Sequence, residues 1–510
     1  MRTLPALAAA ATLLLTTLGT TVPAHAHGDN ERNREMRTQL LAEGDNPLMS
    51  GNVALQSTHP GTVGIAGCFM ETAPLFVTSG LEALTVWDAS DPTKPTRTGV
   101  LANVVFENEA MNCGERRTKK GVRRFALIGI DLYNAAADSN GIAHVSGEAN
   151  QLLLVDVTDP SDPKLLGPEE DPGVPSTTGT HTVACIAETN CRYAYTSGEK
   201  NTFSIFDLRN LDKPREIDSD PGKEGIQPFS SPTGGHKWNF DEAGYGVHTG
   251  YDGSSVFDVS KPREPRLVTT SGAAGRGEDP KAEGYNDFIH HNSYRPSASE
   301  FREGRRPSVD KGNVLLVTEE DYIETDCNKA GSFQTWQVNS LRPGGEELSP
   351  LDKVELGDLH AEQGMNLDLP QGAFCSAHWF DYRPGGIVAI GYYGGGTQFL
   401  DVRDPRDIKS FGYAYMGGSE VWDAMWVPVY NGKGRQTGAK TNIVYSIDLV
   451  RGLDVYSVDV PGKVGIEPMS GTGPQHSAAD LAAAAALPAG LVAGALGLAA
   501  AVRRRARRQA

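Results

Sequence analysis

Hydrophobic residues gather along this chain in short runs bounded by turn-forming residues, and long amphipathic helical patterns are absent. One run recurs: four or five mostly apolar residues end at Asp, and a turn rich in Asp, Pro and Lys follows. Five full copies and then two degenerate ones occupy residues 84–88, 152–156, 203–207, 255–258, 398–401, 333–337 and 453–457. Successive copies lie 51 to 79 residues apart. A repeat of this kind is typical of the blades of a β-propeller.

Further strands flank the recurring run. A second strand precedes most copies, as at residues 193–198 and 314–319, a third lies further upstream, and a short fourth follows. Four antiparallel strands repeated seven times predict an all-β, seven-bladed β-propeller over residues 50–465. Residues 52–56 have no partner before the first blade, and nothing strand-like follows Pro461. We therefore expect residues 52–56 to form the outer strand of the last blade and to close the ring.

The Asp that ends each run is expected to cap the following turn, because Asp accepts backbone N–H groups two residues further on. A ring of catalytic carboxylates is the alternative. The runs resemble the LVIVD repeat family, whose name is nearly spelled by Leu-Leu-Leu-Val-Asp at residues 152–156. The resemblance covers about residues 50–465. It implies a propeller and leaves the activity open, since one fold hosts many functions.

The N-terminus is typical of a secretory signal peptide over residues 1–26. Arg2 is followed by an uncharged stretch at residues 4–18 and by the small-x-small sequence Ala24-His25-Ala26. The alternative, an N-terminal membrane helix, needs about 20 apolar residues, and Thr, Gly and Pro interrupt this run earlier. Cleavage would leave a flexible leader at residues 27–49. His27 at its start could chelate copper through its amine and ring.

The C-terminus predicts a membrane anchor. Residues 481–502 are uncharged and consist mainly of Ala, Leu, Gly and Val. A stretch of this length is long enough for a transmembrane helix. Five arginines follow within residues 503–510 and predict a cytoplasmic tail. The propeller would then be extracytoplasmic, joined to the cell membrane through a linker at residues 466–480. A disordered Ala-rich tail is the alternative, because Ala and Gly insert less readily than Leu.

The net charge and the cysteines narrow the choice of binding partners and of cellular compartment. The net charge is −17, and excluding Arg2 and the five tail arginines leaves 41 basic against 64 acidic residues, or −23. This charge argues against nucleic acid and anionic lipid as partners. Six cysteines in an exported chain predict disulfides. Cys185 and Cys191 flank a short turn, and position within the repeat favours Cys68 with Cys113 and Cys327 with Cys375, although six cysteines allow 15 pairings.

Histidine placement is the feature that points to chemistry. Four histidines stand just before the first strand of their blades, and inner strands line the channel of a propeller, so the side chains should converge. Second strands add His248, Glu319 and Glu320, and His290 adjoins one of the four. Imidazole and carboxylate suit zinc, copper or iron. The predicted ligands of one divalent ion are His181, His236, His291 and His378, with His290, His248 and Glu319 in reserve.

A structural role is the alternative for these histidines, since each could bond the backbone of the next blade. The layout is similar to that of selenium-binding proteins, which are propellers with methanethiol oxidase activity, but no contiguous motif is shared. The sequence contains no GxSxG, Walker, GxGxxG or HExxH motif, and assigns no catalytic residue. His290 and His291 could form acid/base pairs with Asp381 or Asp423.

Two functions remain. One is a surface-displayed binding or scaffold module for an unknown protein or small molecule at the propeller face. The other is a metal-dependent, oxidoreductase-like enzyme that uses the histidine cluster.

Overall fold

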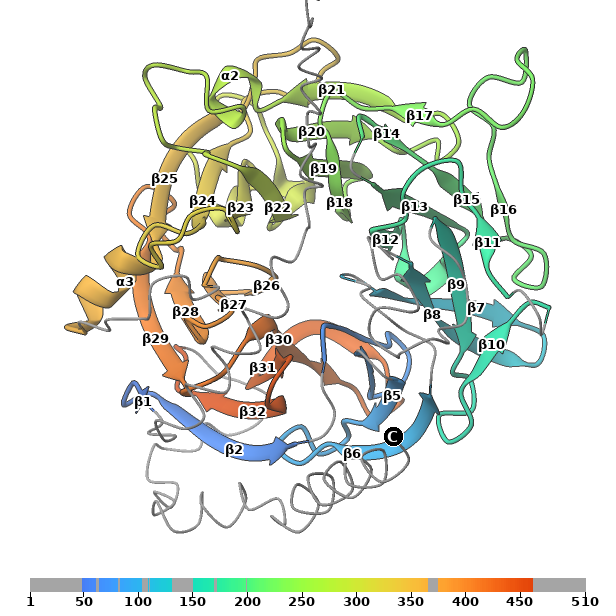
Figure 1. The fold of residues 1–510 in the computed structure, drawn as a ribbon, viewed down its shortest axis with the longest axis horizontal. Helices are drawn as coiled ribbons and strands as arrows, with labels where there is room; N and C mark the ends of the chain where they lie inside the picture. The colour runs from blue at the N-terminus through green and yellow to red at the C-terminus, as the bar shows by residue number, and fades with distance from the viewer. Residues whose placement is uncertain are drawn as a thin grey trace, which may run out of the picture.

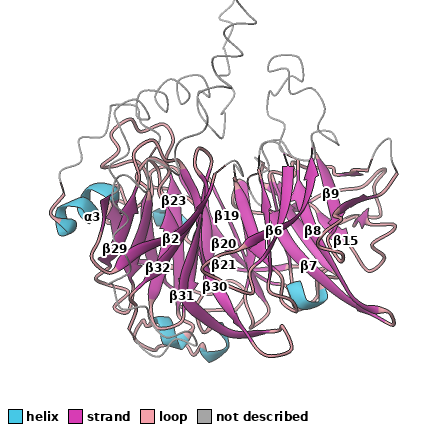
Figure 2. Cartoon of the chain, turned by 90° about the horizontal axis from the view of Figure 1, so that it is seen from below, coloured by secondary structure: helices cyan, strands magenta, loops and turns pink. Residues whose placement is uncertain are grey.

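The computed structural model describes residues 48–461 apart from residues 61–63, 81–82, 103–108, 110, 131–149, 169–171, 199 and 366–374. Strands make up almost all of the regular structure, and they form a ring of seven sheets around a central axis (Figures 1 and 2). Each sheet has at least four antiparallel strands. The seven-bladed, all-β propeller with four-stranded blades is thereby confirmed.

The first three blades run from the inner to the outer strand in chain order. Blade 1 contains β3 (Ala66–Phe69), β4 (Leu75–Ser79), β5 (Ala83–Asp88) and β6 (Thr96–Ala102). Blade 2 contains β7 (Met111–Thr118), β8 (Gly121–Gly129), β9 (Gln151–Asp156) and β10 (Lys164–Leu166), and β11 (Val174–Pro175) also pairs with β9. Blade 3 contains β12 (Thr182–Cys185), β13 (Tyr193–Ser197), β15 (Ile205–Asp207) and β16 (Arg215–Glu216), flanked by the pair β14 (Thr202–Phe203) and β17 (Phe229–Ser230).

The remaining blades follow the same plan. Blade 4 contains β18 (Gly235–Phe240), β19 (Tyr245–Gly250), β20 (Gly253–Asp258) and β21 (Arg266–Thr270), and blade 5 contains β22 (Ile289–Tyr294), β23 (Val314–Glu320), β24 (Ser332–Gln337) and β25 (Ser349–Glu355). Blade 6 contains β26 (Phe380–Arg383), β27 (Ile387–Gly391), β28 (Thr397–Asp401) and β29 (Lys409–Tyr415), and blade 7 contains β30 (Val421–Tyr430), β31 (Gln436–Asp448) and β32 (Gly452–Val458). Short helices occur in the connections: η1 (Glu188–Asn190), α2 (Gly272–Gly275), η2 (Ala298–Glu300), η3 (Val309–Lys311) and α3 (Leu356–Gln363).

The ring closes across the two ends of the described chain. The strand β2 (Val53–His59) pairs antiparallel with β32 as the outer strand of blade 7, so that the blue and red ends of the ribbon lie side by side in Figure 1. This confirms the closure expected for residues 52–56. In addition, β1 (Leu48–Met49) pairs with β29, so two residues that we assigned to the leader extend blade 6.

The repeated run forms the third strand of every blade, and its Asp caps the next turn. The Oδ1 atom accepts the backbone N–H two residues on in all five full copies, at 2.8 to 3.0 Å, from Asp88, Asp156, Asp207, Asp258 and Asp401. The structural role expected for this Asp is therefore confirmed, and no ring of catalytic carboxylates forms from these residues.

Apolar side chains fill the seven interfaces between neighbouring blades. Phe76 and Tyr445, for example, pack between blades 1 and 7, and Leu315 and Val256 pack between blades 5 and 4. Burying one such side chain contributes about 1.5–3 kcal/mol. The hydrophobic core therefore lies between the blades, and the inner strands line the axis.

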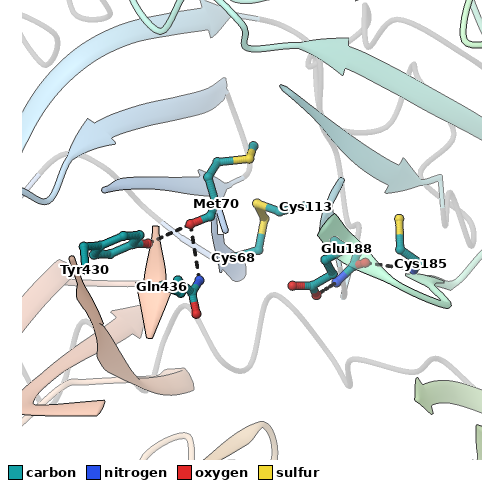
Figure 3. The surroundings of a disulfide bond; sticks show 8 residues. Cys68, Met70, Cys113, Cys185, Glu188, Tyr430 and Gln436 are labelled. Carbon is teal, nitrogen blue, oxygen red and sulfur yellow. Dashed lines mark hydrogen bonds between the residues drawn. A yellow bond between two sulfur atoms is a disulfide. The ribbon is translucent and has the colours of Figure 1, made fainter. Parts of the chain in front are cut away.

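All six cysteines form disulfides, in the pairs that the repeat favoured: Cys68–Cys113, Cys185–Cys191 and Cys327–Cys375. The first joins the inner strands of blades 1 and 2 (Figure 3). The third joins blades 5 and 6. The signal peptide (1–26), most of the leader (27–49), the linker (466–480), the anchor (481–502) and the tail (503–510) lie outside the described residues. Within the described part of the chain, no helix has the length and apolar character needed to cross a membrane.

Candidate metal centre

Four histidines reach the axis from the starts of four consecutive inner strands. His236 lies in β18 and His291 in β22, whereas His181 and His378 stand one and two residues before β12 and β26. None of the four is more than 4% exposed. The convergence that the sequence predicted is therefore present in the structure.

β-Bulges help to aim two of these side chains. The pairing of β18 with β19 skips His236, and the pairing of β22 with β23 skips His291. The extra residue of a bulge leaves the regular alternation of the strand, and bulges are frequent next to functional sites. A bulge at Trp422 in β30 continues the pattern into blade 7.

The four imidazoles surround the carboxylate of Glu109. Its Oε2 contacts His181 Nε2 and lies 3.6 Å from His236 Nε2, and these two nitrogens are 3.1 Å apart. Its Oε1 lies 2.5 Å from His291 Nε2 and 2.8 Å from His378 Nε2. All four Nε2 atoms thus face a single buried carboxylate, two on each oxygen.

Glu320 brings a second carboxylate to the cluster. Its Oε2 lies 3.6 Å from His291 Nε2 and 3.9 Å from His236 Nε2, and it has no hydrogen-bond partner in the described part of the molecule. Its Oε1 accepts a hydrogen bond of 2.6 Å from the Tyr393 hydroxyl. Glu320 is completely buried. A carboxylate in such a place is costly unless a positive charge lies beside it.

The protonation preferences in the cluster conflict. Burial lowers the pKa of His236, His291 and His378, and so favours neutral rings. Burial would also raise the pKa of Glu109, but the neighbouring imidazoles hold it well below its usual range. Burial, helped by Glu109, raises the pKa of Glu320 well above its usual range. A cation among these groups would satisfy neutral rings and charged carboxylates together.

The tautomer of His378 also indicates that a cation or a proton is required beside Glu109. Its Nδ1 lies 2.7 Å from the carbonyl oxygen of Trp422, which can only accept, so Nδ1 carries the hydrogen. The Nε2 atom of a neutral ring then presents a lone pair to Glu109 Oε1 at 2.8 Å. Two lone pairs repel at that distance unless a proton or a metal ion is shared. His378 therefore contacts the backbone of the next blade through Nδ1 while its Nε2 atom faces the axis.

The possible ligands form two overlapping groups around Glu109. One contains Glu109, His181 and His236, and the other contains Glu109, His291, Glu320 and His378; within each group the ligand atoms lie within 4.8 Å of one another. All four predicted histidines therefore belong to the cluster, although they form two pairs on the two oxygens of one carboxylate.

The reserve residues His290, His248 and Glu319 belong to neither group. Successive side chains of a strand point to opposite faces, so His290 and Glu319 point away where His291 and Glu320 face the axis. His290 Nδ1 lies 2.8 Å from Ser254 Oγ, and Glu319 accepts from Ser332 Oγ at 2.6 Å. His248 uses its Nδ1 and Nε2 atoms in hydrogen bonds with Ser231 Oγ and Ser197 Oγ.

The acid/base pairs considered for His290 and His291 are absent among the described contacts. His291 bonds Glu109, and Asp381 pairs instead with Lys440 Nζ at 2.9 Å.

Sequence reasoning missed Glu109. It lies two residues before β7, the inner strand of blade 2, which is the place that His378 occupies in blade 6. The repeat position was therefore the available signal, but a search limited to histidine passes over an acidic residue there.

A cavity of about 350 Å³ adjoins the cluster within the channel. Several residues of its lining directly follow the ligand histidines, namely Lys237, Asn292 and Trp379. The Trp379 ring lies 4.2 Å from the His291 ring between centroids, and Lys237 Nζ lies 3.8 Å from the centre of the Trp379 ring. Trp379 therefore separates the metal-ligand candidates from the cavity.

Comparisons with known proteins leave the family open. No family model matches the chain, and no curated protein matches it. The resemblance to LVIVD repeats accordingly stays a prediction. Among solved structures, the chain is similar to the β-propeller domain of Cps50 (Swd1) from Myceliophteria thermophila, with a TM-score of 0.45 and 11% identity over 80% of this chain and 99% of that one. The propeller architecture described above rests on the strand pairings themselves.

Proposed function

We propose that this protein is an extracytoplasmic metalloprotein whose propeller holds one divalent transition-metal ion on its axis. His181, His236, His291 and His378 would be its nitrogen ligands. The observation that carries the proposal is the convergence of four buried Nε2 atoms on the carboxylate of Glu109.

Charge supports one ion. In the cluster, two carboxylates meet four imidazoles, and burial favours the neutral form of His236, His291 and His378. With neutral rings, the formal charge of the cluster is −2 when Glu109 and Glu320 are ionised. One divalent cation makes this set neutral, and buried charge is tolerated only when it is compensated. A second divalent ion would leave an excess positive charge.

The ligand chemistry favours copper, zinc or iron, because imidazole nitrogen suits these ions. Glu109 would either complete the ligand set or accept hydrogen bonds beside it. A bound copper or iron ion supplies redox chemistry, and zinc supplies Lewis-acid chemistry. The adjoining cavity gives a small molecule a place next to the cluster, which favours the enzyme hypothesis over a pure scaffold.

The location is part of the same proposal. Three disulfides are typical of proteins outside the reducing cytoplasm. The N-terminal and C-terminal sequences add the signal peptide and the membrane anchor at residues 481–502.

Binding or scaffolding without a metal is the second candidate, since propeller faces commonly bind partners. The two candidates are separated by metal analysis of protein purified without a histidine tag, with variants His291→Ala and His378→Ala. We expect about one equivalent of copper, zinc or iron in the wild type, and at least a tenfold loss of affinity in each variant. His290→Ala is the matched control, because His290 neighbours His291 in β22 yet points away from the cluster.

Absence of stoichiometric metal after growth with each of the three ions would reject the metal centre and leave the scaffold. Equal metal content in His290→Ala and His291→Ala would reject the assigned ligands. Circular dichroism of each variant verifies that the propeller is folded.

A further inference from the structure

Tyr393 has a backbone conformation that an aromatic residue seldom adopts. Its φ is +46°, in the left-handed region, and among the described residues it is the only aromatic one with a positive φ. A bulky side chain is strained there, and such strain persists only where the surroundings hold it. Three glycines follow at residues 394–396, yet this left-handed position is occupied by tyrosine. Strained residues are frequent at functional sites, so the side chain of Tyr393 is of interest.

Backbone hydrogen bonds fix this conformation. The N–H of Tyr393 donates to the carbonyl oxygen of Val421 at 2.9 Å, and the N–H of Val421 donates back at 3.0 Å. The carbonyl oxygen of Tyr393 also accepts the N–H of Gly396 at 3.0 Å. Tyr393 follows β27 of blade 6, and Val421 begins β30 of blade 7. The strained residue is therefore tied to the next blade of the ring.

Two adjacent tyrosines of this turn differ in what their hydroxyl groups meet. Both side chains are completely buried. Tyr392 lies in the hydrophobic core between blades 5 and 6, and its hydroxyl has no hydrogen-bond partner among the residues that the structure describes. The hydroxyl of Tyr393 donates to Glu320 Oε1 at 2.6 Å. The strained residue is thus the one whose hydroxyl group reaches the cluster on the axis.

The ring of Tyr393 lies beside the histidine cluster. Its centroid is 4.6 Å from that of the His378 ring and 5.2 Å from that of the Trp422 ring. It also belongs to a small hydrophobic cluster with Ile65 and Leu449. The ring and the hydroxyl therefore have separate roles: the ring fills space between the blades, and the hydroxyl binds a carboxylate.

The hydrogen bond from Tyr393 determines which oxygen of Glu320 faces the imidazoles. With Oε1 held by the phenol, Oε2 lies 3.6 Å from His291 Nε2 and 3.9 Å from His236 Nε2. No described group donates a hydrogen bond to Oε2. The terminal torsion of a glutamate is broad, so this hydrogen bond is what fixes the carboxylate plane. Carboxylates that bind metal ions are commonly oriented by a hydrogen bond of this kind.

We propose that Glu320 binds the metal ion through Oε2 and that Tyr393 is the positioning residue that holds it in place. The inference rests on the proposed metal centre and deepens it, because it adds an oxygen ligand and the residue that orients this ligand. It also explains the left-handed conformation: the turn after β27 brings a hydroxyl group to the axis, where Glu320 needs a donor, instead of leaving it in the hydrophobic core as at Tyr392.

The test is copper(II) binding to the metal-free full-length protein, measured by competition with a chelator. Copper(II) serves as the probe because a site for zinc or iron(II) binds it at least as tightly. Tyr393→Phe removes the hydroxyl and keeps the ring in its hydrophobic cluster. We expect it to lower the copper affinity about 10- to 100-fold, as loss of a residue that orients a ligand does, and to change the electron paramagnetic resonance spectrum of the bound copper.

Tyr392→Phe is the matched control, because it removes the buried hydroxyl of the neighbouring residue, which has no described partner. It should leave both the affinity and the spectrum unchanged. A double-mutant cycle with Glu320→Gln shows whether Tyr393 acts through Glu320. Glu320→Gln alone should weaken binding at least tenfold, and adding Tyr393→Phe to it should weaken binding further by no more than about twofold.

The outcomes separate this inference from the metal centre itself. A copper-binding wild type whose affinity and spectrum are the same in Tyr393→Phe, or whose losses multiply in the double variant, would overturn the positioning role alone. Wild-type affinity in Glu320→Gln would overturn the assignment of Glu320 as a ligand and leave the histidines in place. A folded wild type that takes up no stoichiometric copper would reject the metal centre and this inference with it.

Discussion

Acid should destabilise this propeller through His248, a histidine that the fold keeps neutral. The side chain lies in β19 and is completely buried. Its Nε2 lies 2.9 Å from Ser197 Oγ, its Nδ1 lies 2.7 Å from Ser231 Oγ, and its ring stacks on Trp238. Among the residues that the structure describes, no carboxylate forms an ion pair with this ring, and burial lowers the pKa of His248 to about 3.

The size of the effect follows from the difference between the folded and unfolded states. In the unfolded chain the pKa of His248 is about 6.5. Between pH 3 and 6.5 the unfolded state therefore binds one more proton than the folded state, so the free energy of unfolding rises with pH in this window. The contribution is complete above pH 6.5 and is lost as the pH falls. At pH 5 it is smaller by about 2 kcal/mol than at pH 7.5.

The measurement compares guanidinium unfolding at pH 7.5 and pH 5 for metal-free wild type, His248→Gln and Ser231→Ala. Glutamine does not titrate, so the pH-dependent loss of stability should be smaller by about 2 kcal/mol in His248→Gln. Ser231→Ala disturbs the same hydrogen bonds but keeps the imidazole, and should lose as much stability on acidification as the wild type. Any pH-independent cost of either substitution cancels in the comparison.

An unchanged pH dependence in His248→Gln would refute the reasoning, because some other group would then have to take up the proton. The same variant also separates structural from axial histidines. His248 lies outside both groups around Glu109, so we expect His248→Gln to retain the metal content of the wild type.

Three further predictions concern the fold. Replacing Cys185 and Cys191 by Ser should lower the free energy of unfolding by about 2 kcal/mol and leave the propeller folded, whereas replacing Cys68 and Cys113 should lower it by about 4 kcal/mol. The two pairs are 6 and 45 residues apart, and a disulfide that closes a longer loop stabilises more. Denaturant unfolding of the oxidised proteins measures both losses, and the reverse order would contradict the prediction. Asp156→Ala should lower stability by about 1 kcal/mol through loss of its turn cap, with Asp162→Ala, an exposed residue of the same turn, as the control; equal losses would argue against the cap. Deleting residues 48–60 should expose the edge of β32 and produce aggregation in size-exclusion chromatography, and a monomer with wild-type unfolding would show that β2 is dispensable.

Much of the fold could be predicted because a propeller repeats its local rules. The run ending in Asp reappears as the third strand of each blade, and the turn cap at Asp88 or Asp401 is a short-range interaction that the sequence states directly. Even the disulfide Cys68–Cys113 followed from position in the repeat, since equivalent positions in adjacent blades lie side by side.

The candidate site could be predicted only in part, because its geometry depends on strand register. Period-two alternation decides which member of His290–His291 and of Glu319–Glu320 faces the axis, and a bulge shifts that choice by one residue. The sequence contains both members of each pair and does not show where the bulge falls. Glu109 stands two residues before its inner strand, as His378 does, so the repeat places it near the axis; that its carboxylate meets four imidazoles depends on the assembled strands.

The β-bulges connect the regular strand pairing of the blades with the polar site on the axis. A regular inner strand would send every second side chain between the blades, where the apolar core of a propeller lies. By placing His236 and His291 outside the regular pairing, β18 and β22 turn a polar side chain to the axis while the flanking residues keep their places in the sheet. The following residues, Lys237 and Asn292, then line the cavity rather than the core. The same local irregularity thus builds both the histidine cluster and the wall of the cavity beside it, so the proposed metal site and the cavity depend on one feature of the strand register.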